Sequence, residues 1–426
     1  MARLVYSFFL WLLLPLIAIR LWVRSRREPG YSKRLCERFG TYKTALDGPL
    51  IWVHAVSVGE VRASVPLVAG LKSAYPNHRV LVTCMTAAGR DAIDLAYGET
   101  VLAAFLPYDY TFAVRRFLDH FRPSLGILME TEIWFNLLAE CKRLFIPIAL
   151  ANGRMSSGSA KSYRRLSLLT RPAFESLAAV CAQSEADASR FASLGAHHVL
   201  VSGNLKFDAR PDPSLVARGA DLKSGFGEKR ILLLASTRDG EESLLLKSMQ
   251  RRLPLDVVVI LVPRHPQRFK EVAALLDAME FSYARRSLGE SVAGKSVLLG
   301  DTMGEMTMYY AAADVAVIGG SILTYGGQNL IEACAVGVPV IVGPYMQNFS
   351  EATRMAVDCG AAAQVRDTDE AIGKALELLA SPGHREAMGK AGLRFCATHR
   401  GATMRHLVAI RKMLQSGVDG LDCCRS

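Results

Sequence analysis

The sequence predicts an α/β protein of two Rossmann-like halves, each a parallel β-sheet covered by helices, preceded by an apolar helix. Short aliphatic runs alternate with helical stretches along most of the chain, as in βαβ units. One polar, turn-rich segment at residues 206–230 interrupts this alternation. With 426 residues, of which 50% are hydrophobic, the chain is too long for one ordinary core. We therefore expect two domains joined by a linker.

The N-terminal apolar stretch predicts a membrane anchor. Residues Tyr6–Ile19 carry no charge, and Leu21–Val23 extend the stretch past Arg20 to about the length that a bilayer requires. Arginine-rich sequence follows instead of a small-residue cleavage site, so we expect the segment to be retained. Pro15 and Arg20 weaken a clean span, which leaves a helix lying in the membrane interface as the alternative.

The formal net charge is +11, and much of the excess lies just after this stretch. An anionic membrane surface fits this distribution better than nucleic acid, because the basic residues do not line an aromatic-interleaved groove. The basic flank also predicts that the bulk of the protein is cytoplasmic. It consists of Arg20, Arg24, Arg26, Arg27, Lys33, Arg34 and Arg38.

The nine cysteines are scattered, without a CxxC pair or a histidine at zinc-finger spacing. This pattern indicates neither a metal site nor a disulfide framework, and it predicts a reducing compartment. Cys423 and Cys424 are adjacent in a polar tail, where we expect fraying. No dinucleotide-binding or P-loop glycine motif follows a predicted strand, which disfavours hydride transfer and NTP hydrolysis.

The predicted strands are short and aliphatic, as strands covered on both faces should be. We expect an anchor over residues 1–26, one domain over 27–210 and a second over 211–426. Open α/β sheets bind ligands at the carboxyl ends of their strands, so the site is expected in a cleft between the two sheets. The expected strands are 50–54, 79–83, 125–129, 146–150, 179–182 and 199–201, then 230–235, 257–262, 296–299, 315–318 and 339–342.

Glu60 is the first candidate for a catalytic group. It follows Gly59 in the loop after the strand at 50–54, at the expected start of a helix. A carboxylate there could accept the proton of an incoming hydroxyl as a general base. The alternative is that Glu60 only complements the helix dipole.

Two acids and one lysine follow other strands of the first half. Glu130 and Glu132 come directly after the strand at 125–129, and we expect one of them to face the cleft. Lys206 follows the last strand of this half, where it could offer a cation to a phosphate or carboxylate. An ordinary solvated linker lysine is the alternative for Lys206.

Arg264 is the candidate phosphate ligand of the second half. It stands with His265 between Pro263 and Pro266 at a strand end, where its guanidinium would present a rigid fork to a phosphate. Arg238 lies near the end of the preceding strand, before an expected helix start.

Two further turns of the second half could bind a nucleotide. Residues 300–306 lead into a helix whose first backbone N–H groups could bind an anion or a base edge. Asn329 and Glu332 are three apart and would project from one helix face, where the acid could accept ribose hydroxyls. The alternative is an Asn cap followed by a first-turn Glu.

Taken together, these motifs resemble the Kdo transferases of lipopolysaccharide assembly, which move 3-deoxy-D-manno-octulosonic acid (Kdo) from CMP-Kdo onto a lipid A precursor. The resemblance implies a two-domain GT-B architecture, inversion of the anomeric configuration, and catalysis without a metal ion or cofactor. Phe135 and Gln328 stand where the family often has Pro and His. The matching segments, in chain order, are YSKRLCERFG, HAVSVGE, LGILMETEIW, AQSEADASRF, GNLKFD, ASTRDGEE, VPRHPQRF, LGDTMGEM, IGGS and GGQNLIEA.

The resemblance also implies roles for matching residues. Glu60 is similar to the general base that deprotonates the acceptor hydroxyl, and Glu130 and Lys206 to groups that stabilise the transition state. The CMP-binding positions would be Pro263, Arg264, Gly304, Glu305, Met306, Asn329, Leu330, Ile331 and Glu332.

The resemblance therefore implies a glycosyltransferase of the inner membrane that moves Kdo to lipid IV(A), with residues 27–210 binding the acceptor and 211–426 the donor. Inner-membrane phospholipid is an expected partner, and nucleic acid is not. A nucleotide-sugar 2-epimerase of the same fold is a rival that gives no reason for an anchor. A non-catalytic lipid-binding scaffold is a second rival, which has no need of acids and glycine turns at strand ends.

Overall fold

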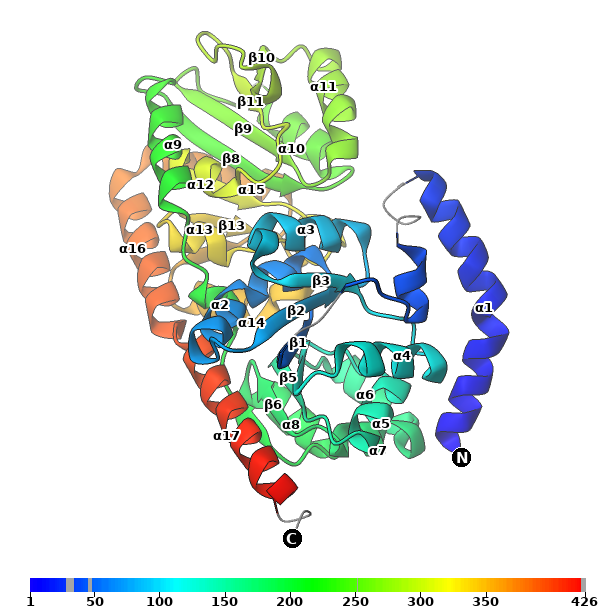
Figure 1. Cartoon of the computed structure of the whole chain (residues 1–426). Helices are drawn as coiled ribbons and strands as arrows, with labels where there is room; N and C mark the ends of the chain where they lie inside the picture. Colours follow the sequence, from blue (N-terminus) through cyan, green and yellow to red (C-terminus); the bar gives the residue numbers. More distant parts are fainter. Residues whose placement is uncertain (28–33, 45–47, 251, 423–426) are drawn as a thin grey trace. The chain divides into compact units, whose positions relative to one another are not determined.

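The chain forms two compact units (Figure 1). The computed structural model describes residues 1–27, 34–44, 48–250 and 252–422. The first unit comprises residues 1–209 together with the chain from Arg400 onward, and the second comprises residues 210–399. Lys33, Cys423 and Cys424 lie outside the described residues.

The first unit contains a seven-stranded parallel sheet in the order β3-β2-β1-β4-β5-β6-β7. Its strands are β1 (Leu50–His54), β2 (Arg79–Cys84), β3 (Leu102–Phe105), β4 (Leu125–Met129), β5 (Ile148–Gly153), β6 (Ala179–Ala182) and β7 (Val199–Val201). Its helices are α1 (Ala2–Arg27), α2 (Val58–Ala74), α3 (Ala87–Tyr97), α4 (Thr111–Phe121), α5 (Phe135–Arg143), α6 (Ser157–Arg165), α7 (Ser167–Glu175), α8 (Glu185–Ser193) and α17 (Ala402–Asp422).

Alternate side chains of β1 enter two different cores, as a strand covered on both faces requires. Leu50 and Trp52 pack in a core that includes residues of α4, α5, α7 and α8. Ile51 and Val53 pack in a second core that includes residues of α2, α3 and α17. The carboxyl ends of the parallel strands therefore lie along one edge of a sheet that helices cover on both sides.

The last helix belongs to the first unit, which corrects the predicted extent of the second domain, 211–426. Ala402, Ile410 and Met413 of α17 are buried in the core shared with α2 and α3. His406 is fully buried, and its Nε2 accepts a hydrogen bond from the backbone N–H of Asn152 in β5 at 2.9 Å. The apolar period of a helix shows that one face is buried but does not identify the surface that covers it.

The second unit contains another seven-stranded parallel sheet, in the order β10-β11-β9-β8-β12-β13-β14. Its strands are β8 (Arg230–Thr237), β9 (Val257–Pro263), β10 (Tyr283–Arg285), β11 (Val297–Leu299), β12 (Val315–Ile318), β13 (Val340–Val342) and β14 (Ala362–Gln364). Its helices are α9 (Pro213–Ser224), α10 (Glu241–Met249), α11 (Phe269–Ala278), α12 (Met306–Ala312), α13 (Ile331–Ala335), α14 (Ser350–Asp358), α15 (Thr368–Ala380) and α16 (Pro382–His399).

Three strands were not predicted, namely β3, β10 and β14. All three are sheet edges of three or four residues, and each has residues that are only partly buried. Such strands produce no long aliphatic run, so the sequence pattern does not separate them from loops.

Helix α1 runs along one side of the first unit, beside α5 and α7 (Figure 1). Within the described part of the chain it contains one segment, Ala2–Val23, whose length and mean hydropathy of 2.1 would suffice to cross a membrane. This is consistent with the predicted anchor.

Candidate active site

The buried carboxyl of Glu60 lies in the first turn of α2. Ser57 caps this helix, and the Glu60 carboxylate accepts hydrogen bonds from the Val56 backbone N–H and the Ser57 hydroxyl, both at 2.9 Å. The Glu60 backbone N–H points back to the Ser57 hydroxyl at 3.4 Å, in the manner of a capping box. With only 8% of the residue exposed, Glu60 is fixed in one orientation at the carboxyl edge of the sheet.

Burial raises the pKa of Glu60 from 4.5 to about 7, and the nearby charges of Glu130 and Glu132 add to the effect. The two hydrogen bonds from Val56 and Ser57 oppose it without cancelling it. A carboxylate whose pKa lies close to neutral pH is suited to take up a proton during a reaction. The alternative, that Glu60 only complements the helix dipole, therefore does not explain its burial and raised pKa.

Glu130 and Lys206 form an ion pair at the same edge. The Lys206 Nζ lies 3.3 Å from the Glu130 Oε1, with about a fifth of each side chain exposed. Glu130 adopts φ 56°, a left-handed conformation that costs energy in a residue other than glycine. Lys206, for which an ordinary linker lysine was the alternative, thus reaches a predicted catalytic glutamate in the structure.

Three amide side chains that were not predicted hold the segment of Lys206 in place. The Asn152 Oδ1 accepts the Leu205 N–H at 3.0 Å, and the Gln183 Nε2 donates to the Asn152 carbonyl at 2.9 Å. Asn204 donates to the Gln183 Oε1 at 3.1 Å and accepts the Lys206 N–H at 3.0 Å. The position of Gln183 directly after β6 was the available signal, but amides at strand ends are common.

Glu132 is oriented by an aromatic pair. Its Oε2 accepts a hydrogen bond from the Trp134 indole N–H at 2.9 Å. The His54 ring meets Trp134 edge to face, at a centroid distance of 6.3 Å. Burial raises the pKa of Glu132. Both acids that follow β4 therefore lie within electrostatic reach of Glu60, whereas the sequence reasoning expected only one of them near the site.

Basic side chains gather at the carboxyl ends of β8 and β9 in the second unit. The Arg264 Nε donates to the Gln328 Oε1 at 3.2 Å, and Arg238 lies 2.6 Å from the His265 Nε2. Burial lowers the pKa of His265, and the charges of Arg238 and Arg264 lower it further. An anion is the ligand that such a cluster favours. The sequence placed Arg238 and Arg264 at two separate strand ends, and the structure brings both side chains to His265.

Glu305 is held by basic side chains of its own unit. Its carboxylate pairs with Arg218 and, at 3.2 Å, with Arg286, and it accepts a hydrogen bond from the Thr302 hydroxyl. Burial acts to raise the pKa of Glu305, but the hydrogen bonds from Arg286 and Thr302 outweigh it and hold the pKa below 4.5. Gly304 before it has φ 84°, which favours glycine.

The predicted pair Asn329 and Glu332 is brought together, but not on one helix face. Asn329 precedes α13, where its Oδ1 accepts the Ile331 N–H at 3.1 Å and its Nδ2 donates to the Glu332 Oε1 at 2.9 Å. The backbone N–H groups of Gly327 and Gln328 donate to the carbonyls of Gly320 and Gly319. These two amides are therefore paired within the turn and are not open to a phosphate.

The buried Glu241 holds the neighbouring glycine loop. Its carboxylate accepts the N–H groups of Gly320 at 2.6 Å, Ile322 at 2.9 Å and Leu323 at 3.3 Å. It also accepts the Arg238 N–H at 2.9 Å, so Glu241 fixes both the loop and the arginine. Glu241 is the first residue of α10, so a single helix start positions both features.

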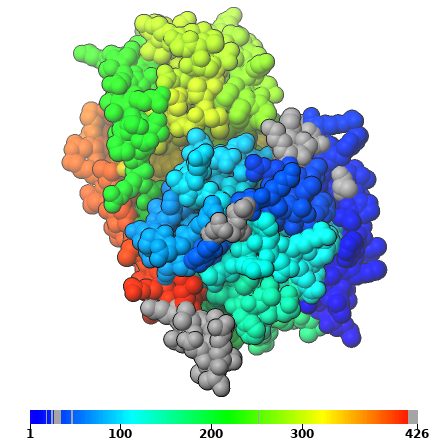
Figure 2. Space-filling model, in the orientation of Figure 1, coloured from blue at the N-terminus to red at the C-terminus, as the bar shows by residue number. Residues whose placement is uncertain are grey.

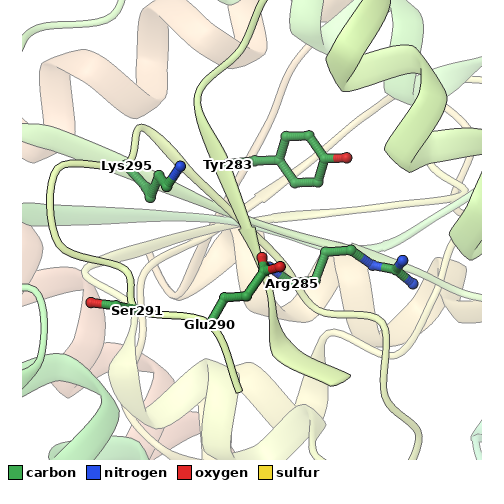
Figure 3. Close-up of a pocket in the computed structure, with 5 residues that line it drawn as sticks. All are labelled: Tyr283, Arg285, Glu290, Ser291 and Lys295. Carbon is green, nitrogen blue, oxygen red and sulfur yellow. The ribbon is translucent and has the colours of Figure 1, made fainter. Parts of the chain in front are cut away.

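Figure 3 shows a shallow polar pocket elsewhere in the second unit, lined by Tyr283, Arg285, Glu290, Ser291 and Lys295. Arg285 pairs with Asp301 at 2.7 Å and the Tyr283 hydroxyl donates to Asp277 at 3.3 Å, so the polar groups of these two residues already have partners. None of the predicted site residues lines this pocket.

Across the described ranges, no three His, Cys, Asp or Glu side chains are grouped so as to hold a metal ion. Catalysis without a metal stays a prediction.

Comparison with known families matches both units. A model described as 3-deoxy-D-manno-octulosonic-acid transferase (kdotransferase) matches residues 33–209, and one described as glycosyl transferases group 1 matches residues 284–395. A 3-deoxy-D-manno-octulosonic acid transferase of Bordetella pertussis is 43% identical, with 97% of this chain and 100% of the relative aligned. One of Haemophilus influenzae is 35% identical, with 98% and 100% aligned.

Solved structures share the fold at low identity. A UDP-GlcNAc 2-epimerase of Neisseria meningitidis has a TM-score of 0.59 and 15% identity, covering 85% of this chain and 100% of that one. A glycosyltransferase of Rickettsia africae has a TM-score of 0.60 and 12% identity, covering 87% and 99%. With the two parallel sheets, this likeness confirms the predicted GT-B fold.

Proposed function

The chain belongs to the 3-deoxy-D-manno-octulosonic acid transferase family of glycosyltransferases, and on this premise we propose that it transfers Kdo from CMP-Kdo to lipid IV(A) in lipopolysaccharide core biosynthesis. The observation that carries the proposal is the burial of the Glu60 carboxyl at the strand ends, beside Glu130 and Glu132. A buried carboxyl with a pKa of about 7, flanked by two other acids, is suited to deprotonate a sugar hydroxyl at neutral pH.

In the proposed reaction, the acceptor hydroxyl oxygen attacks the anomeric carbon of Kdo and its proton passes to Glu60. The bond between that carbon and the phosphate oxygen breaks, and its electron pair leaves with CMP. Attack opposite the departing phosphate inverts the anomeric configuration.

Glu130 and Lys206 would stabilise the transition state. Their 3.3 Å ion pair holds a cation at the strand ends, and Lys206 can turn from Glu130 toward a substrate carboxylate or developing negative charge. The amides of Asn152 and Asn204 support this role, because they fix the backbone from which Lys206 extends.

The second unit would bind the donor. Arg264 would take the CMP phosphate, and Pro263, Gly304, Glu305 and Met306 would line the nucleotide. Asn329, Leu330, Ile331 and Glu332 complete the proposed donor segments. The basic group around His265 supports an anionic ligand here, and the arginines would take the phosphate charge without a metal ion. Residues 27–210, with α17 packed against them, would bind the acceptor.

The proposed location is the cytoplasmic face of the inner membrane, where α1 would contact phospholipid. The length and hydropathy of Ala2–Val23 support a membrane location, and the acceptor is itself a membrane lipid.

Transfer of isotope-labelled Kdo from freshly made CMP-Kdo to lipid IV(A), followed by lipid extraction, tests the proposal. Labelled lipid should form with the wild-type protein and not with Glu60→Gln. Release of CMP without labelled lipid, or conversion of a UDP-sugar to its 2-epimer instead, would exclude the proposed reaction.

A further inference from the structure

We propose that α1 lies in the plane of the membrane instead of crossing it, and that the start of α7 forms a second contact with an anionic lipid bilayer. The lipid-facing surface is defined by the outer residues of α1 and by two leucines near α7. It comprises Phe8, Phe9, Leu12, Leu13, Leu16, Ile19, Leu166 and Leu168.

One stripe of α1 is docked on the first unit along most of its length. Near its start, the Tyr6 hydroxyl donates to the Asp109 Oδ2 at 3.0 Å, and the Tyr110 hydroxyl donates to the Leu10 carbonyl at 2.8 Å. Near its end, Leu21 is 8% exposed and packs with Ala87. Tyr6 and Leu21 are about 22 Å apart along the helix axis, at about 1.5 Å per residue.

This docking is incompatible with a span. A helix that crosses the hydrocarbon layer needs about 30 Å of apolar surroundings. The buried polar side chains of Asp109 and Asn136 accept hydrogen bonds from Tyr6 and Ser7 of α1, and a crossing helix would carry them into hydrocarbon. Charged and polar groups are costly at that depth, so a docked α1 has to stay near the surface.

The opposite stripe of α1 is apolar and open. Phe8, Phe9, Leu12, Leu16 and Ile19 are each between 58% and 61% exposed. Figure 2 shows α1, in blue, on the surface of the molecule. Helices of this kind bury their apolar face in the boundary between headgroups and acyl chains, and aromatic residues such as Trp11 and Trp22 favour that boundary.

The second contact follows from two leucines that packing does not explain. Leu166 is 60% exposed and Leu168 is 86% exposed, at the junction of α6 and α7. Helix α7 contacts α1, so the junction continues the same side of the unit. Arg164 and Arg165 precede the leucines and are exposed, and Arg171 follows them with a 69% exposed side chain. Apolar side chains between arginines match acyl chains beneath anionic headgroups.

Labelling in sealed inside-out inner-membrane vesicles tests the orientation. The exposed Cys36 and Cys359, together with Cys423 and Cys424, are replaced by serine, and Ala2→Cys is added at the start of α1. A second variant lacks the Ala2→Cys change and retains the exposed Cys359, which reports the side of the membrane on which the second unit lies. An impermeant maleimide should label both variants without detergent. Labelling of Ala2→Cys only after permeabilisation would show that α1 crosses the membrane and overturn the proposal.

A spin label on the full chain tests the second contact. Leu168→Cys and the matched control Leu255→Cys, whose native leucine is 97% exposed in the second unit, are bound to vesicles of phosphatidylethanolamine with phosphatidylglycerol. Collisions with oxygen should increase, and those with a nickel chelate decrease, only at position 168. Leu166→Ser/Leu168→Ser should weaken partition into these vesicles about tenfold, and Leu255→Ser should not. Equal behaviour of positions 168 and 255 would overturn the second contact.

Discussion

Replacing Glu60 by glutamine should abolish transfer and also stabilise the first unit in a pH-dependent manner. Burial, together with Glu130, raises the pKa of Glu60 from 4.5 to about 7 in the folded protein. The folded state therefore holds this proton more tightly than the unfolded chain does, and stability falls as the pH rises through that window. Above about pH 7 the ionised carboxylate costs about 3 kcal/mol, which an uncharged glutamine avoids.

Urea unfolding followed by tryptophan fluorescence measures this effect, because all four tryptophans lie in the first unit. The stability gain of Glu60→Gln should grow by about 2 kcal/mol or more between about pH 5 and about pH 8.5. A pH-independent loss of about 1 kcal/mol should accompany it, because the amide retains only one of the two acceptor oxygens.

Ser57→Ala is the matched control, because the Ser57 hydrogen bond lowers the pKa of Glu60. Its removal should move the acid limb of kcat/KM to higher pH, with transfer retained. A stability difference that does not change with pH, or near-normal turnover of Glu60→Gln, would refute the reasoning.

Three further changes test other parts of the molecule. Lys206→Met should lower kcat about a hundredfold. It should also move the acid limb of kcat/KM to higher pH, because it removes the cation that lies 3.3 Å from Glu130. An unchanged pH profile would contradict this prediction. Arg264→Ala should lower kcat/KM for CMP-Kdo at least about tenfold, and magnesium should not restore it. The control Arg354→Ala, at an exposed arginine of α14, should leave kcat/KM unchanged. Loss of wild-type activity in EDTA, restored by magnesium, would assign the phosphate charge to a metal. His406→Ala should destabilise the first unit by about 2 kcal/mol or more, because it leaves the Asn152 N–H unpaired and opens a cavity. The difference in stability between the wild type and His406→Ala should shrink from pH 6.5 toward pH 4, because burial lowers the pKa of His406 to about 4 and the unfolded wild-type chain binds the proton first. Urea midpoints across that range check both statements.

The central strands could be predicted from the sequence because burial on both faces leaves an uninterrupted aliphatic run. β1 has the predicted bounds, 50–54, and β12 the predicted 315–318. The edge strands β3, β10 and β14 could not, because partial exposure shortens the run, whereas the edge strand β7 consists of the aliphatic residues Val199–Val201 and was predicted. Helix α17 was assigned to the wrong unit because its apolar face predicts burial but does not identify which unit buries it.

The candidate site was predictable as a set of strand ends but not as a set of interactions. Glu60 and Glu130 lie 70 positions apart, and only the order of β1 and β4 in the sheet brings their charges together. The left-handed backbone of Glu130 and the amides of Asn152 and Asn204 leave no pattern that distinguishes them from ordinary loop residues. A glycine-rich turn likewise does not reveal which of its amides are already paired, as those of Gly327 and Gln328 are.

Each unit contains a cluster of side chains of like charge, acidic in the first unit and basic in the second, which folding alone would not favour. In the first, ionisation of Glu60 is costly because the carboxyl is buried and because Glu130 and Glu132 are near, and the hydrogen bonds from Val56 and Ser57 offset only part of this cost. In the second, burial and the charges of Arg238 and Arg264 lower the pKa of His265. During transfer from an anionic donor, the enzyme has to take up the proton of the acceptor hydroxyl and release a negatively charged phosphate. The acidic cluster has the sign that attracts the proton, and the basic cluster has the sign that attracts the phosphate. Proton uptake by Glu60 and anion binding by the arginines both relieve repulsion, and the energy stored in each unit therefore favours the charge changes of the reaction.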